Sequence, residues 1–299
     1  MAESLAKIIR DAAVGIGSFY GLPMPTTGST VFVDSTTGTD DADHGDISNP
    51  VATLDYGIGL CTASKGDMLI VMPGHAENLG VAGVDADVAG ISIIGLGNGS
   101  NRPTFTFTGA AGADWDFDAA NIKVFNCRFI GSEDGLTGPF DVNAAYCGMY
   151  GCEYRDDGTE NVLRWLVLDA NGDDFELINA RNYGTSTAGN AAFLSAGACD
   201  NLLIRNLHSY GDFSVGNLEL TAAATNLLVD RCWLRNLNAC DCNIEGFAGA
   251  TGEVCDCRMN IATDTQTTWI HTQGNLTVYE SYGTNQPAEA GKFIGTVSV

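Results

Sequence analysis

The feature that most constrains this chain is a repeat of about 25 residues that runs through most of its length. NLLVDRCWL at residues 226–234 aligns position for position with NIKVFNCRF at residues 121–129. Five further segments fall in the same register, and they begin at residues 146, 174, 201, 251 and 275. The second positions of the seven copies, residues 122, 147, 175, 202, 227, 252 and 276, are separated by 25, 28, 27, 25, 25 and 24 residues. Such a period is typical of a solenoid whose units stack on one another.

Each copy has the pattern of a short strand followed by a corner. The fourth position is always apolar and holds Val124, Met149, Leu177, Ile204, Val229, Val254 and Val278. Its alternation with the second position predicts a strand with one face turned inward. The sixth position holds Asn126, Gly151, Asn179 and Asn206, then Arg231, Asp256 and Glu280 in the last three copies. Because asparagine and glycine tolerate a left-handed backbone, the sequence predicts a sharp corner, and the preference for such residues fades toward the C-terminus.

The seventh position is rich in cysteine. It holds Cys127, Cys152, Cys232 and Cys257, with Ala180, Leu207 and Ser281 in the other copies. In stacked parallel strands, equivalent side chains lie ~4.8 Å apart and form a continuous internal ladder. Cysteine is a small, readily buried residue that suits such a ladder. We therefore interpret the four cysteines as a structural core ladder and not as reactive groups.

The repeat predicts an all-β fold, a single-stranded right-handed parallel β-helix with coils of about 25 residues. Helical leucine-rich repeats have a similar period, but these copies lack regular leucine spacing and a helix-length segment. We expect the β-helix domain to span residues 29–299. Residues 51–63 place apolar side chains at helical spacing and predict a short amphipathic capping helix. Residues 1–28 predict a helical arm followed by a linker rich in proline and glycine.

The N-terminal third carries a resemblance to a known family. VFVDSTTGTD, NPVATLDYGI and KGDMLIVMPGHAEN, followed by ISIIGLG and the coils, resemble the pectin-lyase-like right-handed parallel β-helix superfamily. The subpattern PGHAEN, followed by IIGLGNGSNRP, is most similar to small β-helix virion proteins encoded by phages. The resemblance implies a helix that caps the first coil and association into a homotrimer. It says little about activity, because this fold carries lyases, hydrolases, tailspikes and inert structural proteins.

The charge balance restricts the partners. The chain has 37 acidic and 14 basic residues and a formal net charge of −23, which disfavours nucleic acid and anionic membranes as partners. Residues 1–11 are interrupted by charges, so we expect no secretory signal peptide and synthesis in the host cytoplasm. No uncharged apolar window is long enough for a membrane span. In a reducing cytoplasm, we expect the ten cysteines to be free thiols or metal ligands rather than disulfides.

Asp114, Asp116 and Asp118 are weak candidates for catalysis, and we favour the alternative that they form a solvated outer face without function. In a strand they share one face, opposite Trp115 and Phe117. Alternate residues are about 6.5 to 7 Å apart, which permits the carboxylate pair of a glycosidase. His75 and Glu77 also invite a catalytic interpretation, but no nucleophile is near in sequence, and we favour a structural hydrogen bond. No lyase motif is present, and the arginines are scattered along the chain.

Two groups suggest metal binding, and we favour neither. The loop with Asp40, Asp41, Asp43 and Asp46 is dense in oxygen ligands for calcium but lacks the EF-hand spacing. Two CxC motifs are typical of zinc ligands, and they contain Cys240, Cys242, Cys255 and Cys257. The repeat turns Cys257 inward and Cys255 outward, so these ligands would not converge. We expect no cofactor, with calcium as the one alternative.

We expect a non-enzymatic bacteriophage virion protein, displayed as a capsid decoration or a short tail spike and bound to capsid or tail proteins. Leu5, Ile8, Ile9, Ala12 and Ile16 form one helical stripe, which either packs on the coils or attaches the protein to its particle. The alternatives are a tailspike-like polysaccharide depolymerase acting as a glycoside hydrolase and a carbohydrate-binding module for a host-surface glycan. Because sugars stack on exposed rings, an outward row of aromatics such as Trp165, Trp233 or Trp269 would favour a glycan site. The role of residues 284–299 stays open.

Overall fold

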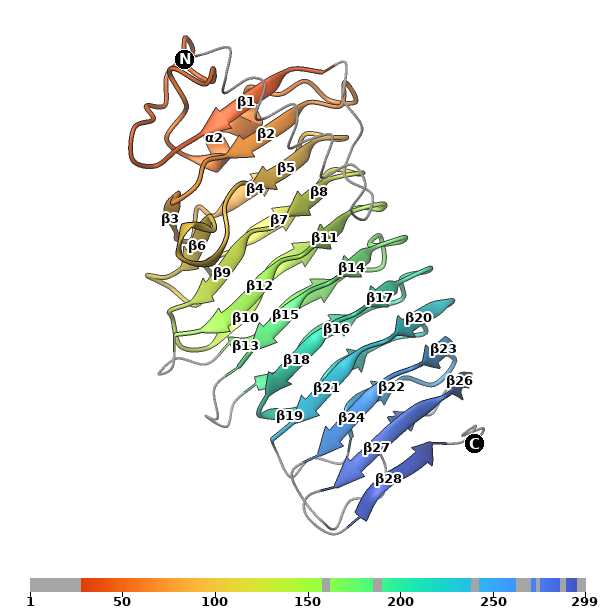
Figure 1. The fold of residues 1–299 in the computed structure, drawn as a ribbon. Helices are drawn as coiled ribbons and strands as arrows, with labels where there is room; N and C mark the ends of the chain where they lie inside the picture. Colours follow the sequence, from red (N-terminus) through yellow and green to blue (C-terminus); the bar gives the residue numbers. More distant parts are fainter. Residues whose placement is uncertain are drawn as a thin grey trace.

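The computed structural model describes residues 28–157, 162–184, 190–237, 242–261, 270–272, 275–285 and 289–294. Three long sheets run along one axis in this part of the chain, and successive coils add strands to each sheet in turn (Figure 1). We call them sheet A, sheet B and sheet C, in the order in which each coil passes through them. The prediction of an all-β parallel solenoid is confirmed, and the right-handed sense of its coils stays a prediction.

Sheets A, B and C contain ten, ten and eight strands. Sheet A consists of β1 (Thr30–Val33), β2 (Met68–Val71), β5 (Ser92–Gly95), β8 (Lys123–Phe125), β11 (Gly148–Tyr150), β14 (Glu176–Ile178), β17 (Leu203–Arg205), β20 (Leu227–Asp230), β23 (Thr251–Cys255) and β26 (Asn275–Tyr279). Sheet B consists of β3 (Ala76–Leu79), β6 (Thr104–Phe107), β9 (Arg128–Gly131), β12 (Glu153–Asp156), β15 (Arg181–Tyr183), β18 (His208–Gly211), β21 (Trp233–Asn236), β24 (Arg258–Ile261), β27 (Ser281–Asn285) and β28 (Glu289–Ile294). Sheet C consists of β4 (Val84–Ala86), β7 (Trp115–Phe117), β10 (Leu136–Val142), β13 (Val162–Leu168), β16 (Asn190–Ala196), β19 (Phe213–Leu220), β22 (Ile244–Gly246) and β25 (Ile270–Thr272).

Strands of successive coils are parallel, so equivalent positions stack along the axis. On sheet A, Val124 pairs with Met149, and Met149 pairs with Leu177. Among the described strands, β28 alone is antiparallel, and it pairs with β27 at the C-terminal end. β28 thereby covers an edge of sheet B that would otherwise be left unpaired.

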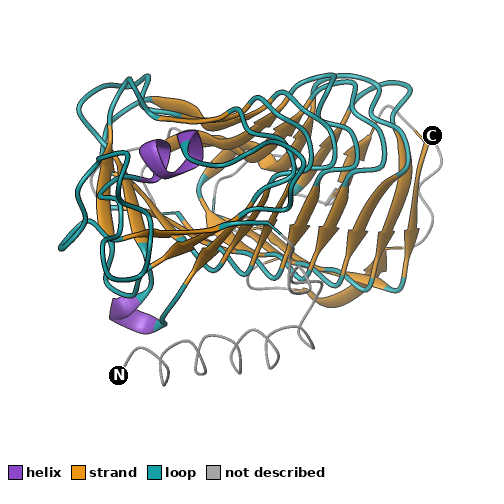
Figure 2. Cartoon of the chain, turned by 90° about the horizontal axis from the view of Figure 1, so that it is seen from above, coloured by secondary structure: helices purple, strands orange, loops and turns teal. Residues whose placement is uncertain are grey.

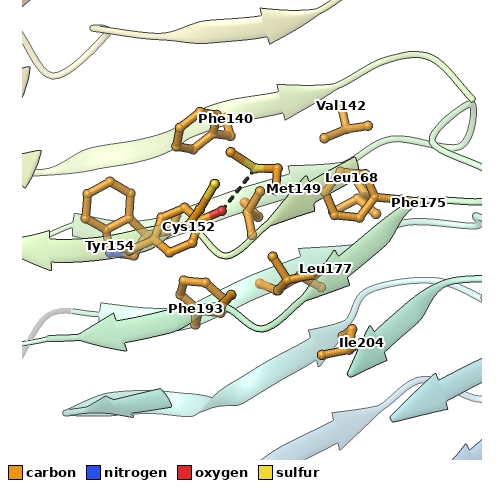
Figure 3. Packing of buried hydrophobic residues seen from close by; sticks show 14 of the residues in the cluster. Phe140, Val142, Met149, Cys152, Tyr154, Leu168, Phe175, Leu177, Phe193 and Ile204 are labelled. Atoms are coloured by element: carbon orange, nitrogen blue, oxygen red, sulfur yellow. Dashed lines mark hydrogen bonds between the residues drawn. The ribbon is translucent and has the colours of Figure 1, made fainter. Parts of the chain in front are cut away.

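The inward side chains of the three sheets form one continuous core. Phe129 packs near its centre, with its ring centroid 4.6 Å from that of Phe140 and 5.5 Å from that of Tyr154. The Tyr154 hydroxyl lies inside this core and donates a hydrogen bond to Met149 Sδ at 3.0 Å (Figure 3). Because each fully buried aromatic or aliphatic side chain contributes roughly 1.5 to 3 kcal/mol, this core accounts for most of the stability of the coils.

The cysteine column lies inside this core. Cys127, Cys152, Cys232 and Cys257 are all buried. Cys152 Sγ lies 3.8 Å from the carbonyl oxygen of Val124, and Cys232 Sγ lies 3.7 Å from that of Ile204, so these thiols donate to preceding coils. Burial raises the pKa of the Cys152 thiol to about 11, which keeps it protonated and unreactive.

The corners of the coils keep one conformation along the chain, although the preference for asparagine and glycine fades toward the C-terminus. φ lies between 43° and 64° at the sixth position of all seven copies: Asn126, Gly151, Asn179, Asn206, Arg231, Asp256 and Glu280. Paired strands on both sides of the corner fix this conformation, even where the residue disfavours it by about 1 kcal/mol. A second left-handed corner precedes the strand of sheet A, at Asn121, Tyr146, Asp174, Asn201 and Asn226.

The described helices are α2 (Leu54–Gly59) and η1 (Gly99–Asn101), both near the N-terminal end of the coils (Figure 2). Thr53 caps α2 by accepting a hydrogen bond from the Tyr56 amide, and Leu54 is buried. The helix is shorter than the predicted range of 51–63, since glycine inside a helix favours its ending. Neither helix is long and apolar enough to cross a membrane. The stripe Leu5, Ile8, Ile9, Ala12 and Ile16 lies outside the described residues.

Candidate functional site

The candidate carboxylates lie on the outward face of sheet C. Trp115 and Phe117 of β7 are buried, so Asp116 between them faces outward. In the strands on either side, Asp116 pairs with Asp85 of β4 and Asp141 of β10. We call Asp85, Asp116 and Asp141 the acidic ladder. The sequence indicated only its middle member, because the strands of sheet C lie outside the repeat segments that align in the sequence.

Asp114 and Asp118 flank Asp116 along the chain just outside β7. Asp114 is half-buried, whereas Asp118 is exposed. The Asn143 side chain donates a hydrogen bond to Asp118 Oδ1 at 2.9 Å. The three predicted candidates therefore lie near one another along the chain. The carboxyls that stack directly on Asp116, however, belong to the preceding and following coils and not to its own strand.

Burial and mutual repulsion make the ladder carboxyls unusually basic. The pKa of Asp116 rises from 3.8 to about 6, mainly through burial and then through the neighbouring carboxylates of Asp114 and Asp141. The pKa of Asp141 also rises to about 6, again through burial first and then through Asp169. Within the described part of the chain, neither carboxyl forms an ion pair with lysine or arginine. Near pH 6 such a pair holds about one proton, as acid–base catalysis requires.

The ladder changes character farther along sheet C. In the next three coils, the position equivalent to Asp141 is occupied by Val167, Ser195 and Glu219. Glu219 accepts hydrogen bonds from Arg164 and Ser195 at 3.0 and 3.1 Å. The column thus changes from adjacent carboxylates at Asp85, Asp116 and Asp141 to a carboxylate that is paired with arginine at Glu219.

His75 and Glu77 form a structural link. His75 is buried, and its Nδ1 accepts a hydrogen bond from the Ser35 amide at 3.0 Å. Its Nε2 lies 3.0 Å from Glu77 Oε2, which also accepts from the Leu54 amide at 3.1 Å. These contacts join the end of β1, the start of α2 and β3, so the two side chains hold the first coil together.

The acidic loop uses its carboxylates to hold its own backbone. Asp40 accepts hydrogen bonds from the Ala52 and Thr53 amides and from the Thr53 hydroxyl, at 2.8, 3.1 and 2.8 Å. Asp46 accepts from the Ser48 and Asn49 amides, and these bonds lower its pKa. Asp41 accepts from the Asp43 amide at 3.2 Å. Across the described ranges, no cluster of three or more His, Cys, Asp or Glu side chains has the geometry of a metal site.

The cysteine motifs are split between two environments. Cys257 is buried, whereas Cys255 is half-buried and its thiol lies 3.6 Å from Asp230 Oδ1. Cys240 lies outside the described residues. The tryptophans also differ, since Trp165 is buried, Trp233 is 52% exposed and Trp269 lies outside the described residues.

Sequence reasoning missed one cluster. The arginines described above as scattered include Arg155, Arg181, Arg235 and Arg258, which all lie on the outward face of sheet B. Their separations are close to multiples of the coil length, and that spacing was the signal that could have revealed the cluster.

The comparisons with known proteins add little to this picture. No family model matches the chain, and no curated protein is significantly similar to it. A solved structure described as a rhamnogalacturonan lyase is similar over 89% of this chain and 90% of its own, with 11% sequence identity and a TM-score of 0.43. A likeness of this size carries no argument about function. The parallel β-solenoid agrees with the resemblance to the pectin-lyase-like superfamily at the level of the fold.

Proposed function

We propose that this protein is a structural component of a bacteriophage virion, displayed on the capsid or the tail as a homotrimer. The observation that carries the proposal is the network of side chains that ties each coil to the next. Arg128 Nε donates to Glu153 Oε1 across coils at 3.0 Å, and Arg205 Nε donates to Asp230 Oδ2 at 2.7 Å. Asn206 Nδ2 likewise donates to Asn179 Oδ1 at 2.7 Å.

A body tied in this way suits a durable display role. In a solenoid, stability is the sum of the coils and of their nearest-neighbour interfaces, so cross-coil bonds resist local opening. The phage setting is supported by the sequence resemblance, and the apolar stripe in residues 1–28 is the proposed attachment segment.

The test combines composition and deletion. Purified particles from the source culture should contain this chain in a fixed ratio to the major capsid protein when measured by quantitative mass spectrometry. Removal of residues 1–28 should leave a folded body that no longer joins the particle, and sedimentation should show a trimer. Particles without the chain would contradict the proposal, and a truncated chain that still attaches would contradict the role of the arm.

Glycan hydrolysis is the second candidate, and the neighbouring pair Asp116 and Asp141 favours it. Parallel strands place equivalent residues ~4.8 Å apart, close to the separation of carboxyls in retaining glycosidases of about 5 to 5.5 Å. This candidate predicts release of reducing ends from a polysaccharide, with a maximum near pH 6. Asp116→Asn and Asp141→Asn should each reduce that rate about 100-fold or more, whereas Asp43→Asn in the distant acidic loop should not. Unchanged rates in the two ladder variants would exclude this site.

A further inference from the structure

The outward face of sheet B carries arginine and aromatic side chains at stacked positions. One row of stacked positions runs from Arg155 through Tyr183 and Tyr210 to Arg235. The adjacent row includes Trp233 and Arg258, which pair in successive coils. We call Arg155, Tyr183, Tyr210, Trp233, Arg235 and Arg258 the arginine–aromatic strip.

The rings of the strip are open to solvent and are held in place. Tyr183, Tyr210 and Trp233 are 42%, 37% and 52% exposed. The guanidinium carbon of Arg155 lies 5.3 Å from the ring centroid of Tyr183, and that of Arg235 lies 5.1 Å from the ring centroid of Tyr210. Such cation–π contacts orient the rings and the cations together, so the surface is arranged before any ligand arrives.

The strip is cationic although the chain carries a net charge of −23. Arg155 is paired with Glu153 at the N-terminal end of the strip. Arg235 and Arg258 have no described carboxylate within ion-pair distance, unlike Arg205 on sheet A, which is paired with Asp230. The Nε of Arg235 is also buried without a hydrogen-bond partner among the described groups, so one donor remains unsatisfied.

We propose that the arginine–aromatic strip binds an acidic polysaccharide chain that lies along the solenoid axis. Exposed tyrosine and tryptophan rings stack on sugar faces, and arginine pairs with carboxylates. Successive coils rise by ~4.8 Å, close to the length of one pyranose unit, so consecutive sugars meet consecutive coils. The inference goes beyond the virion proposal, because it assigns a ligand to a surface that the proposal does not use.

The same surface fits a nucleic acid less well. Single-stranded nucleic acid also stacks on aromatic rings, and its backbone would place phosphates along the strip. A nucleic acid carries a charge on every unit, whereas an acidic polysaccharide can alternate charged and neutral sugars, so the acidic remainder of the molecule repels a nucleic acid more strongly.

The test is calorimetric titration of the full-length protein with matched hexasaccharides. The probes are cello-hexaose, its C6-oxidised form in which each glucose is a glucuronate, and two other carboxylated hexasaccharides of different linkage. We expect at least one carboxylated chain to bind about tenfold or more tightly than its neutral counterpart, and the binding to weaken as salt is raised.

Variants locate the binding. Trp233→Ala and Arg258→Gln should each weaken it by about tenfold. Tyr279→Ala and Lys65→Gln remove an exposed ring and an exposed cation elsewhere, and they should change it by less than about twofold. Thermal melts of all four variants establish that the fold is retained.

Three results would overturn the proposal. The first is absence of binding to all carboxylated probes, and the second is binding that the strip variants and the control variants affect equally. The third is preferential binding of single-stranded DNA or anionic lipid vesicles, which would assign the strip to another class of partner. None of these results bears on the copy number of the chain in particles, so the virion proposal is tested separately.

Discussion

Replacing Asp116 by asparagine should stabilise the protein at neutral pH and have no effect in acid. The pKa of Asp116 rises from 3.8 to about 6 in the folded chain, mainly through burial. The folded state therefore binds more protons than the unfolded state between about pH 4 and pH 6, and its stability falls as pH rises through that window. Above it, the ionised carboxylate imposes its full penalty.

The magnitude follows from the same pKa. A rise from 3.8 to about 6 corresponds to about 3 kcal/mol for a carboxyl wholly removed from water. Asp116 is only half-buried, so solvent screening reduces the expected gain on substitution to about 1 kcal/mol. Asp141→Asn should act in the same direction, because the pKa of Asp141 also rises to about 6.

The assay is urea unfolding at about pH 8 and about pH 4, followed by the fluorescence of the buried Trp115 and Trp165. Asp43→Asn is the control, since Asp43 is an exposed loop residue and the substitution changes the net charge equally. A gain of the same size at both pH values, or a loss of stability at pH 8, would refute the reasoning. If the free energy of unfolding increases only at high pH, the ionised carboxylates of Asp116 and Asp141 destabilise the folded protein.

Three further predictions concern stability and can be checked by the same unfolding assay. Glu280→Gly should stabilise the chain by about 0.5 to 1 kcal/mol, because φ is 43° there, whereas Thr277→Gly in the neighbouring strand should destabilise it by a similar amount. Phe129→Ala should cost about 3 to 5 kcal/mol through a cavity among the core rings, and Tyr183→Ala on the surface should cost less than about 1 kcal/mol. Asp40→Ala should cost about 1 to 2 kcal/mol by removing three hydrogen bonds to the backbone and side chain of the loop, and added calcium should leave the melting temperature of the native protein unchanged.

The sequence was sufficient to predict the coils because their period is a direct consequence of stacking. Val124 and Met149 share a column in the sequence and pair in the sheet, since equivalent positions of parallel coils must coincide. Residue type is no guide at Arg231, where the flanking strands impose a left-handed backbone with a φ of 52° on a residue that does not favour it. Local preference is a poor guide where neighbouring coils determine the conformation.

The candidate site was only partly predictable. Asp116 stood out because it alternates with Trp115 and Phe117, but its partner Asp141 lies in a different coil, 25 residues away. No periodic pattern marks sheet C, whose strands lie between the recognisable segments. Burial and repulsion, which raise the pKa values of both carboxyls, arise only when the coils are stacked.

Stacking also explains how one acidic chain can present faces of opposite character. A solenoid repeats each position once per coil, so a preference at one position becomes a stripe along the axis. On sheet C that stripe contains Asp85, Asp116 and Asp141, and on sheet B it contains Arg235 and Arg258. An anionic polymer would be repelled from the first face and held on the second. The two faces therefore differ in the partner that each accepts, and a long ligand suits stripes of this kind better than a small molecule does.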